Sequence, residues 1–90
     1  MVRDELETAA EALRNAADEA EADETRERLE TQAEQFETLS NADRGPDHGR
    51  LARHEHILRS IAGGEGGAVA EHVDEALYAI HDFRGTLEGV

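Results

Sequence analysis

The stretch AVAEHVDEALYAIHDFRGTL, residues 68–87, decides the fold of this chain. Its apolar residues recur in alternating steps of four and three, which places them in one stripe along a helix. Because no other segment holds so many large apolar side chains, the sequence predicts a helix here against which the other helices pack. The stripe consists of Val69, Val73, Ala76, Ile80, Phe83 and Leu87, and Leu77 widens it.

Two helical patterns fill the first half of the chain. Residues 2–22 repeat the four-three spacing with alanine at half of the stripe positions, and alanine both favours helix and lets helices approach closely. A second stripe over residues 24–40 does not continue in phase from the first, so residues 21–25 are predicted to turn. The other interpretation of residues 21–25 is a bend within one long helix.

The clearest break falls at Gly45 and Pro46, because proline disfavours helical geometry in the residue before it. Asp47 is then predicted to be the N-cap of a helix over residues 47–62. His54 lies on the apolar line of that helix and is predicted to be a hydrogen-bonded residue at the edge of the core. The inward face of the helix also holds Leu51, Leu58 and Ile61, with Ile57 beside them.

Four helical segments joined by short links predict an all-α fold, a small antiparallel four-helix bundle in one domain over residues 1–90. The helices are predicted at residues 2–22, 24–40, 47–62 and 68–87. Residues 63–67, four of them glycine, are predicted to be a flexible connector, and Gly89 to be a C-cap. If the first break is only a bend, the alternative is a three-helix arrangement with a long bent first helix, pairing as a dimer.

The chain is strongly acidic, with a net charge of −13, and all nine of its basic residues are arginine. Residues 1–43 hold fourteen acids and four arginines, whereas residues 44–90 hold eight acids and five arginines. Acid excess without lysine, with fifteen alanines and only three aromatic residues, is typical of a protein from a salt-loving archaeon; the other interpretation is an ordinary acidic protein. In molar salt the Debye length is about 3 Å, so acidic faces hardly repel one another.

Catalytic and metal-binding patterns are not found in the sequence. There is no cysteine, and neither of the two serines lies in a nucleophile elbow. His54 and His56 are two residues apart and therefore point to nearly opposite sides of a helix, so they cannot chelate together. We expect no enzymatic activity, no cofactor and no metal site.

The sequence also lacks a pattern for membrane insertion or export. The charged N-terminus has no apolar core of the kind that a signal peptide needs. No apolar run approaches the roughly 20 residues that cross a bilayer. We therefore expect a cytoplasmic protein without membrane contact.

One region departs from the acidic background, because residues 44–59 hold four arginines and three histidines against two acids. A helix N-terminus with arginines can hold an anion. The competing interpretation is that these arginines pair with acids on the first two helices. Acidic surroundings without lysine or interleaved aromatic residues argue against nucleic acid. The candidate contacts are Arg44, Asp47, His48, Arg50 and Arg53.

Two short motifs resemble those of known sequences. DRGPDHGRLAR at residues 43–53 and the ending TLEGV at residues 86–90 resemble a group of short haloarchaeal proteins of unknown function. The resemblance covers nearly the whole chain, as an acidic alanine-rich helical first half, this loop and a closing helix. It implies a salt-loving source and a helical fold, and it brings no activity, cofactor or catalytic residue.

The leading hypothesis for function is a non-catalytic helical interaction protein of a halophile, which associates with itself or with another helical protein. The apolar stripes and the lack of a catalytic constellation favour it. The alternative is a regulatory protein that contacts nucleic acid or another anion through the helix starting at Asp47.

Overall fold

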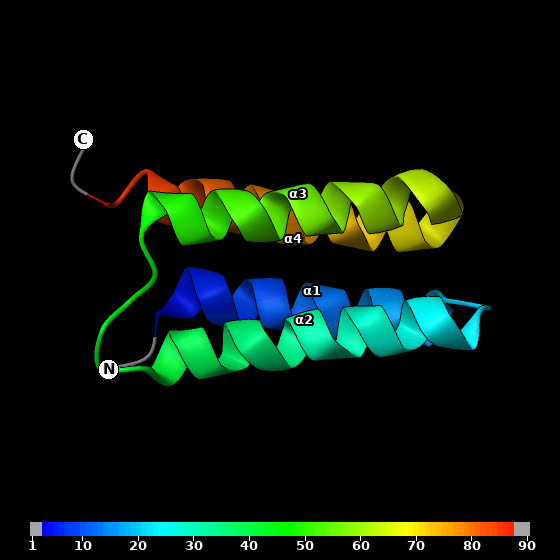
Figure 1. Ribbon diagram of the computed structural model, residues 1–90, viewed down its shortest axis with the longest axis horizontal. Coiled ribbons are helices and arrows are strands. Elements are labelled where there is room, and N and C mark those ends of the chain that lie inside the picture. The colour runs from blue at the N-terminus through cyan, green and yellow to red at the C-terminus, as the bar shows by residue number, and fades with distance from the viewer. Residues whose placement is uncertain (1–2, 88–90) are drawn as a thin grey trace.

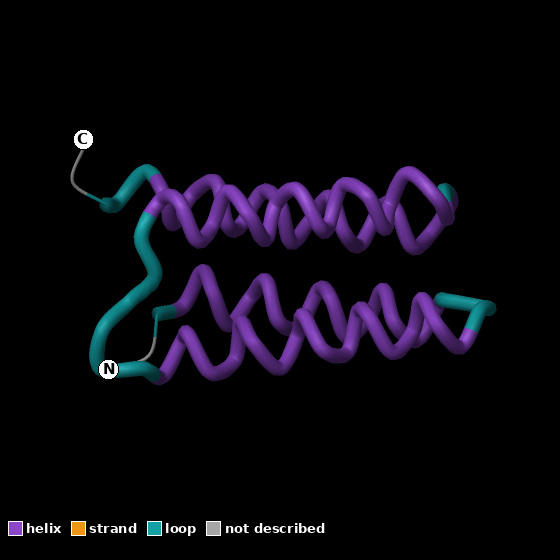
Figure 2. The backbone as a smooth tube through the Cα atoms, viewed as in Figure 1, coloured by secondary structure: helices purple, strands orange, loops and turns teal. Residues whose placement is uncertain are grey.

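The computed structural model describes residues 3–87, and over this range the chain folds into four helices. They are α1 (Asp4–Glu19), α2 (Asp23–Asn41), α3 (His48–Glu65) and α4 (Gly67–Arg84). Successive helices run in opposite directions and form an antiparallel four-helix bundle (Figure 1, Figure 2). The predicted bundle is confirmed, and α1 and α2 are joined by a short turn rather than by a bend.

The four helices are not equally close to one another. α1 packs against both α2 and α4, and α3 packs against α4. The backbones of α2 and α3 do not pack closely, although these helices are neighbours on the side that faces the viewer in Figure 1. The bundle is therefore tight along the series α2, α1, α4, α3 and looser between α2 and α3.

The core is built from the stripes that the sequence predicts. The α4 stripe is buried from Val69 to Phe83, and Leu87 is partly buried against it. α1 contributes mainly alanines, which allow its close approach to both neighbours. These stripes are buried within one chain, and Tyr78, at 70% exposure, is the large apolar residue left exposed among residues 3–87.

The glycine-rich segment differs from its prediction. α3 continues through Gly63 and Gly64 and ends at Glu65, so these glycines are helical and only Gly66 separates α3 from α4. Gly66 has a φ of 66°, in the left-handed region that glycine enters without steric strain. The predicted flexible connector is wrong, because the turn is confined to Gly66 and to the first residue of α4, Gly67, whose φ of 55° is also positive.

The first and last helices end earlier than predicted, because α1 ends at Glu19 rather than at residue 22 and α4 at Arg84 rather than at residue 87. Gly85 is the C-cap of α4, and the predicted cap Gly89 lies outside the described residues. The predicted start of the first helix, residue 2, and most of the TLEGV ending also lie outside them.

Arg3 fastens the start of α1 to the end of α2. Its guanidinium donates hydrogen bonds to the backbone carbonyls of Leu39 at 3.2 Å, Ala42 at 2.6 Å and Asp43 at 3.4 Å. The last turn of α2 has no basic residue, so Arg3 supplies the positive charge that favours a helix C-terminus. A Cβ on Gly45 would lie 2.7 Å from the Nε of Arg3, so any other residue here would require the Arg3 side chain to shift.

Candidate functional site

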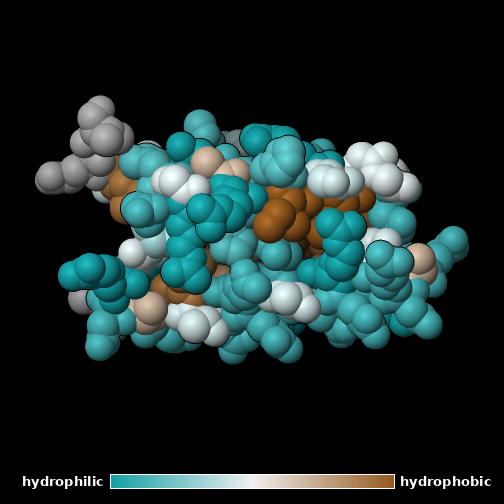
Figure 3. Space-filling model, viewed as in Figure 1, coloured by the Kyte–Doolittle hydropathy of each residue, from teal (hydrophilic) through white to brown (hydrophobic). Residues whose placement is uncertain are grey.

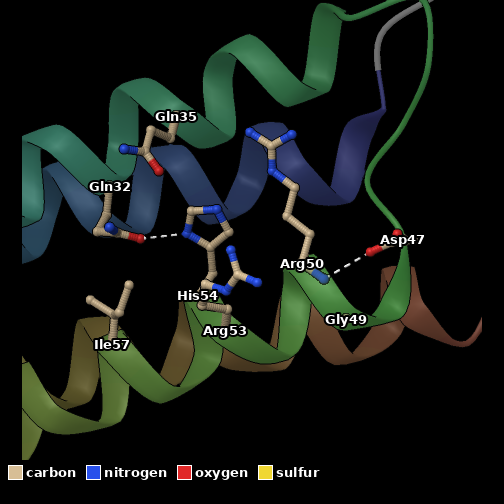
Figure 4. Close-up of a pocket in the computed structure, with 8 residues that line it drawn as sticks. All are labelled: Gln32, Gln35, Asp47, Gly49, Arg50, Arg53, His54 and Ile57. Atoms are coloured by element: carbon tan, nitrogen blue, oxygen red, sulfur yellow. Dashed lines mark hydrogen bonds between the residues drawn. The ribbon is translucent and has the colours of Figure 1, made fainter.

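A cleft of about 580 Å³ opens between α2 and α3, where the two backbones do not pack closely. Figure 3 shows hydrophilic side chains with smaller apolar areas between them on this face of the molecule. α2 lines the cleft with two glutamines, and α3 with its N-terminal turns (Figure 4). The lining residues are Gln32, Gln35, Asp47, Gly49, Arg50, Arg53, His54 and Ile57.

A hydrogen bond between Gln32 and His54 forms the floor of the cleft. The Nδ1 of His54 lies 2.7 Å from the Oε1 of Gln32. Both residues are buried, with His54 6% exposed and Gln32 7% exposed. The ring of Phe36 packs on the imidazole with centroids 4.8 Å apart. Because an amide oxygen only accepts, this contact requires the proton on Nδ1 and leaves Nε2 of the neutral ring as an acceptor.

The sequence contains a signal for this floor that its periodicity alone does not reveal. Gln32 falls on the apolar stripe of α2, four residues before Phe36, and His54 falls on that of α3, three residues after Leu51. A buried polar side chain needs a partner, so two polar residues on facing stripes satisfy each other. The prediction that His54 is hydrogen-bonded at the core edge is confirmed; the role of the two glutamines was missed.

Two polar atoms of the floor remain available to a ligand. Within residues 3–87, neither the Nε2 of His54 nor the amide nitrogen of Gln32 has a hydrogen-bond partner. In the same range, every fully buried side-chain nitrogen or oxygen does have a partner, so these two atoms are not fully buried. Both atoms must therefore reach the solvent of the cleft. Figure 4 shows the second ring nitrogen turned away from Gln32. The floor thus presents one acceptor and one donor.

Arg50 and Arg53 bring positive charge to the cleft. In Figure 4, Arg50 extends from α3 toward α2, and Arg53 stays beside His54. Burial, followed by the charges of Arg50 and then Arg53, lowers the pKa of His54 from its ordinary value near 6.5. A neutral ring is thereby favoured at neutral pH, in which Nε2 is an acceptor.

The arginines of this region do not pair with the acids of the first two helices, contrary to the competing interpretation. No ion pair of Arg44, Arg50, Arg53 or Arg59 occurs within residues 3–87, where the pairs are Arg14–Glu37, Arg26–Asp23, His72–Glu75 and Arg84–Glu55.

The cleft brings together three of the five residues that the sequence proposed as contacts. Asp47 lines it, but its Oδ1 accepts a hydrogen bond from the backbone nitrogen of Arg50 at 2.8 Å, which confirms it as the N-cap of α3. Arg44 is exposed in the preceding loop and is not among the lining residues. His48 is occupied elsewhere, since its Nδ1 accepts a hydrogen bond from the Nε of Arg84 at 3.1 Å.

Arg84 also holds α3 against α4. Its guanidinium lies 2.8 Å from the Oε1 of Glu55, a residue that is only 7% exposed. A buried carboxylate is stable only with such a partner. This ion pair joins α3 to α4, the helix against which its backbone packs closely.

Two further properties of the described residues bear on function. Residues 3–87 contain no group of three or more histidine, aspartate or glutamate residues placed to hold a metal ion. In the same range, every helix is too short or too polar to cross a bilayer.

Comparison with curated proteins and with solved structures finds no match to this chain. A family model described as "Family of unknown function (DUF7553)" matches residues 1–86, nearly the full length of the sequence. This chain therefore belongs to DUF7553, a family of unknown function.

Proposed function

We propose that this protein is a non-catalytic binding protein that recognises an anionic partner through the cleft between α2 and α3. The observation that supports this function is the state of Arg50 and Arg53. In a chain with a net charge of −13, both side chains lie at a cleft without an ion-pair partner among residues 3–87. Guanidinium groups suit carboxylate and phosphate because their donors form a planar fork.

We also propose that the protein works in the cytoplasm of a salt-loving organism. The excess of acids and the absence of lysine support this environment. In molar salt, attraction between charges more than about 3 Å apart is screened. Recognition there depends on direct hydrogen bonds, which the arginines and the polar floor of the cleft can provide.

The test is recovery of a partner from the native host at molar KCl. Wild type is compared with the double variant Arg50→Ala/Arg53→Ala and with the control Arg59→Ala, which removes an exposed arginine of the same helix outside the cleft. We expect wild type and the control to retain the same anionic partner, and the double variant to lose it while keeping its helicity. Equal retention by all three proteins would refute the proposal.

A second copy of the chain is the alternative partner. Tyr78 favours it, because a tyrosine that is 70% exposed on α4 offers an amphipathic contact on an otherwise polar surface. Sedimentation velocity at molar KCl tests this function. A dimer in wild type that becomes a monomer in Tyr78→Ser supports it, and a monomeric wild type excludes it.

A further inference from the structure

We infer that the ligand of the α2–α3 cleft is a small phosphate monoester with a hydroxyl group close to the phosphate, of the sugar-phosphate or polyol-phosphate class. This inference rests on the proposed function and specifies its partner. It follows from the size of the cleft, from the two arginines and from the paired donor and acceptor on the floor.

The size and the charge of the cleft favour a small ligand over a polymer. A volume of about 580 Å³ is within the range of roughly 300–1,000 Å³ that small-molecule sites occupy. A nucleic acid needs many phosphate contacts, and those contacts weaken steeply as salt rises. Beyond the cleft, α2 offers mainly exposed acids, which repel a long polyanion.

Arg50 and Arg53 account for the phosphate. They are three residues apart and so lie on the same side of α3. Two guanidinium forks can bind different oxygens of one phosphate and balance its charge of about −2. Two acids border these arginines: Asp47 lines the cleft, where its Oδ1 caps α3, and Glu34 borders an adjoining hollow with Arg50. Neither lies within ion-pair distance of an arginine among residues 3–87.

The floor accounts for the hydroxyl group. The Nε2 of His54 accepts a hydrogen bond, and the amide nitrogen of Gln32 donates one; both residues are more than nine-tenths buried, and both atoms reach the cleft. A hydroxyl group can donate to the first and accept from the second at the same time. The dianionic phosphate of a monoester can only accept, so the donor to Nε2 must be a separate hydroxyl group of the ligand. Half-buried Ile57 offers an apolar edge for the carbon skeleton.

The experiment is titration calorimetry with four probes, at a KCl concentration where circular dichroism shows the helices fully formed. Ribose 5-phosphate carries both groups, inorganic phosphate lacks the sugar hydroxyls, ribose lacks the phosphate, and gluconate replaces phosphate by carboxylate. We expect saturable binding of ribose 5-phosphate, at least about tenfold weaker binding of inorganic phosphate, and no binding of ribose, because each lost contact to a charged or buried group weakens affinity by about tenfold. Gluconate as tight as ribose 5-phosphate would overturn the assignment to phosphate.

Variants link the binding to the cleft. Arg53→Lys keeps the charge but removes the planar fork, and should weaken ribose 5-phosphate by about tenfold. Glu34→Gln removes the nearby competing carboxylate and should leave binding equal or tighter. In wild type, the imidazole resonances of His54 should shift with the sugar phosphate and much less with inorganic phosphate. Unchanged His54 resonances at saturation would overturn the proposed contact.

Failure of this inference can be separated from failure of the proposed function. If ribose 5-phosphate does not bind, but an anionic partner from the host is lost in Arg50→Ala/Arg53→Ala, the cleft binds another anion and this inference is wrong. If an RNA oligonucleotide binds and depends on the same arginines while ribose 5-phosphate does not, the small-ligand assignment is likewise wrong. If no partner is recovered and no probe binds, both proposals fail.

Discussion

His54 of α3 hydrogen-bonds to Gln32 of α2 across 2.7 Å, between the two neighbouring helices whose backbones do not pack closely. Both side chains are buried, so the bond replaces the apolar contact that these stripe positions would otherwise make. It closes the bundle at its loosest side and at the same time forms the floor of the cleft. Stability and binding are therefore joined in one pair of residues.

The protonation of His54 should make the stability of the fold depend on pH. Burial, with the added charges of Arg50 and Arg53, holds the pKa of His54 below 6.5 in the folded protein. The ring's hydrogen-bond and aromatic partners on α2, Gln32 and Phe36, do not titrate. Below about pH 6.5 the unfolded chain binds a proton that the folded chain resists, so the free energy of unfolding should fall as the pH drops through this range and be fully recovered above about pH 7.5. Urea unfolding at fixed KCl from pH 8 to 5.5 measures it.

The matched control is His54→Gln, which keeps a polar side chain beside Gln32 but takes up no proton. The difference in unfolding free energy between wild type and this variant should shrink on acidification, because only wild type carries the ionisable ring. Parallel curves for the two proteins from pH 8 to 5.5 would show that His54 is not the source of the pH dependence.

Replacement of the helical glycines in α3 should stabilise the protein. Gly63 and Gly64 lie inside α3 without positive φ, and an added Cβ would meet no atom within 4 Å. Alanine at either position should raise the free energy of unfolding by about 0.5–1 kcal/mol, because it restricts the unfolded chain and favours helix. Gly66→Ala is the contrast, since a φ of 66° should make alanine there destabilising by about 1 kcal/mol. Thermal unfolding of the three variants compares them; a loss of stability in both Gly63→Ala and Gly64→Ala would contradict the helical assignment.

The same glycines show what periodicity can and cannot predict. The positions of Val73 and Ile80 in the core follow from spacing alone, because a helix repeats every 3.6 residues whatever packs against it. Whether Gly63 and Gly64 stay helical depends instead on tertiary packing, which holds Ile61 and Val69 in the core on either side of the turn and overrides a weak local preference.

The cleft is a further case in which local pattern was insufficient. The contact between Gln32 and His54 joins residues 22 positions apart and depends on the separation of two helices. A stripe shows which side of a helix faces inward, but it does not show how far away the neighbouring helix lies. The local excess of basic residues predicts Arg50 and Arg53 as candidate contacts for an anion. That they form no ion pair with the acids of α1 and α2 depends on where the fold places those acids.

Removal of Arg84 should destabilise the contact between α3 and α4. Arg84→Ala leaves the buried carboxylate of Glu55 without its ion-pair partner. Because the Arg84 side chain is 30% exposed and water can partly replace it, we expect a loss of about 2 kcal/mol in the free energy of unfolding. Arg59→Ala, at an exposed position without an ion pair among residues 3–87, should change stability by less than about 0.5 kcal/mol.

A double variant distinguishes charge from packing at this site. In Glu55→Gln/Arg84→Ala the buried group is neutral, so part of the loss should be recovered relative to Arg84→Ala. Urea unfolding of both single variants and the double variant gives the coupling. If the double variant is as unstable as the sum of the two single changes, the residues do not interact energetically.

Salt should stabilise the bundle, because its outer surface repels itself in dilute buffer. α2 carries exposed Glu24, Glu27 and Glu30 at intervals of three residues, which brings like charges together on one side of the helix, and none of them forms an ion pair among residues 3–87. The Debye length falls from about 10 Å at 0.1 M to about 3 Å at 1 M, so molar KCl removes most of this repulsion. Helicity and melting temperature should therefore rise from 0.1 to 2 M KCl.

The variant Glu27→Gln/Glu30→Gln tests whether these acids are the source of the repulsion. It should melt at a higher temperature than wild type at 0.1 M KCl and at nearly the same temperature at 2 M KCl, because at 2 M the salt already screens the repulsion that the substitution removes. If wild type has the same melting temperature at both salt concentrations, repulsion within the acidic surface does not destabilise the fold. The proposal of a salt-loving origin would then lose its physical basis.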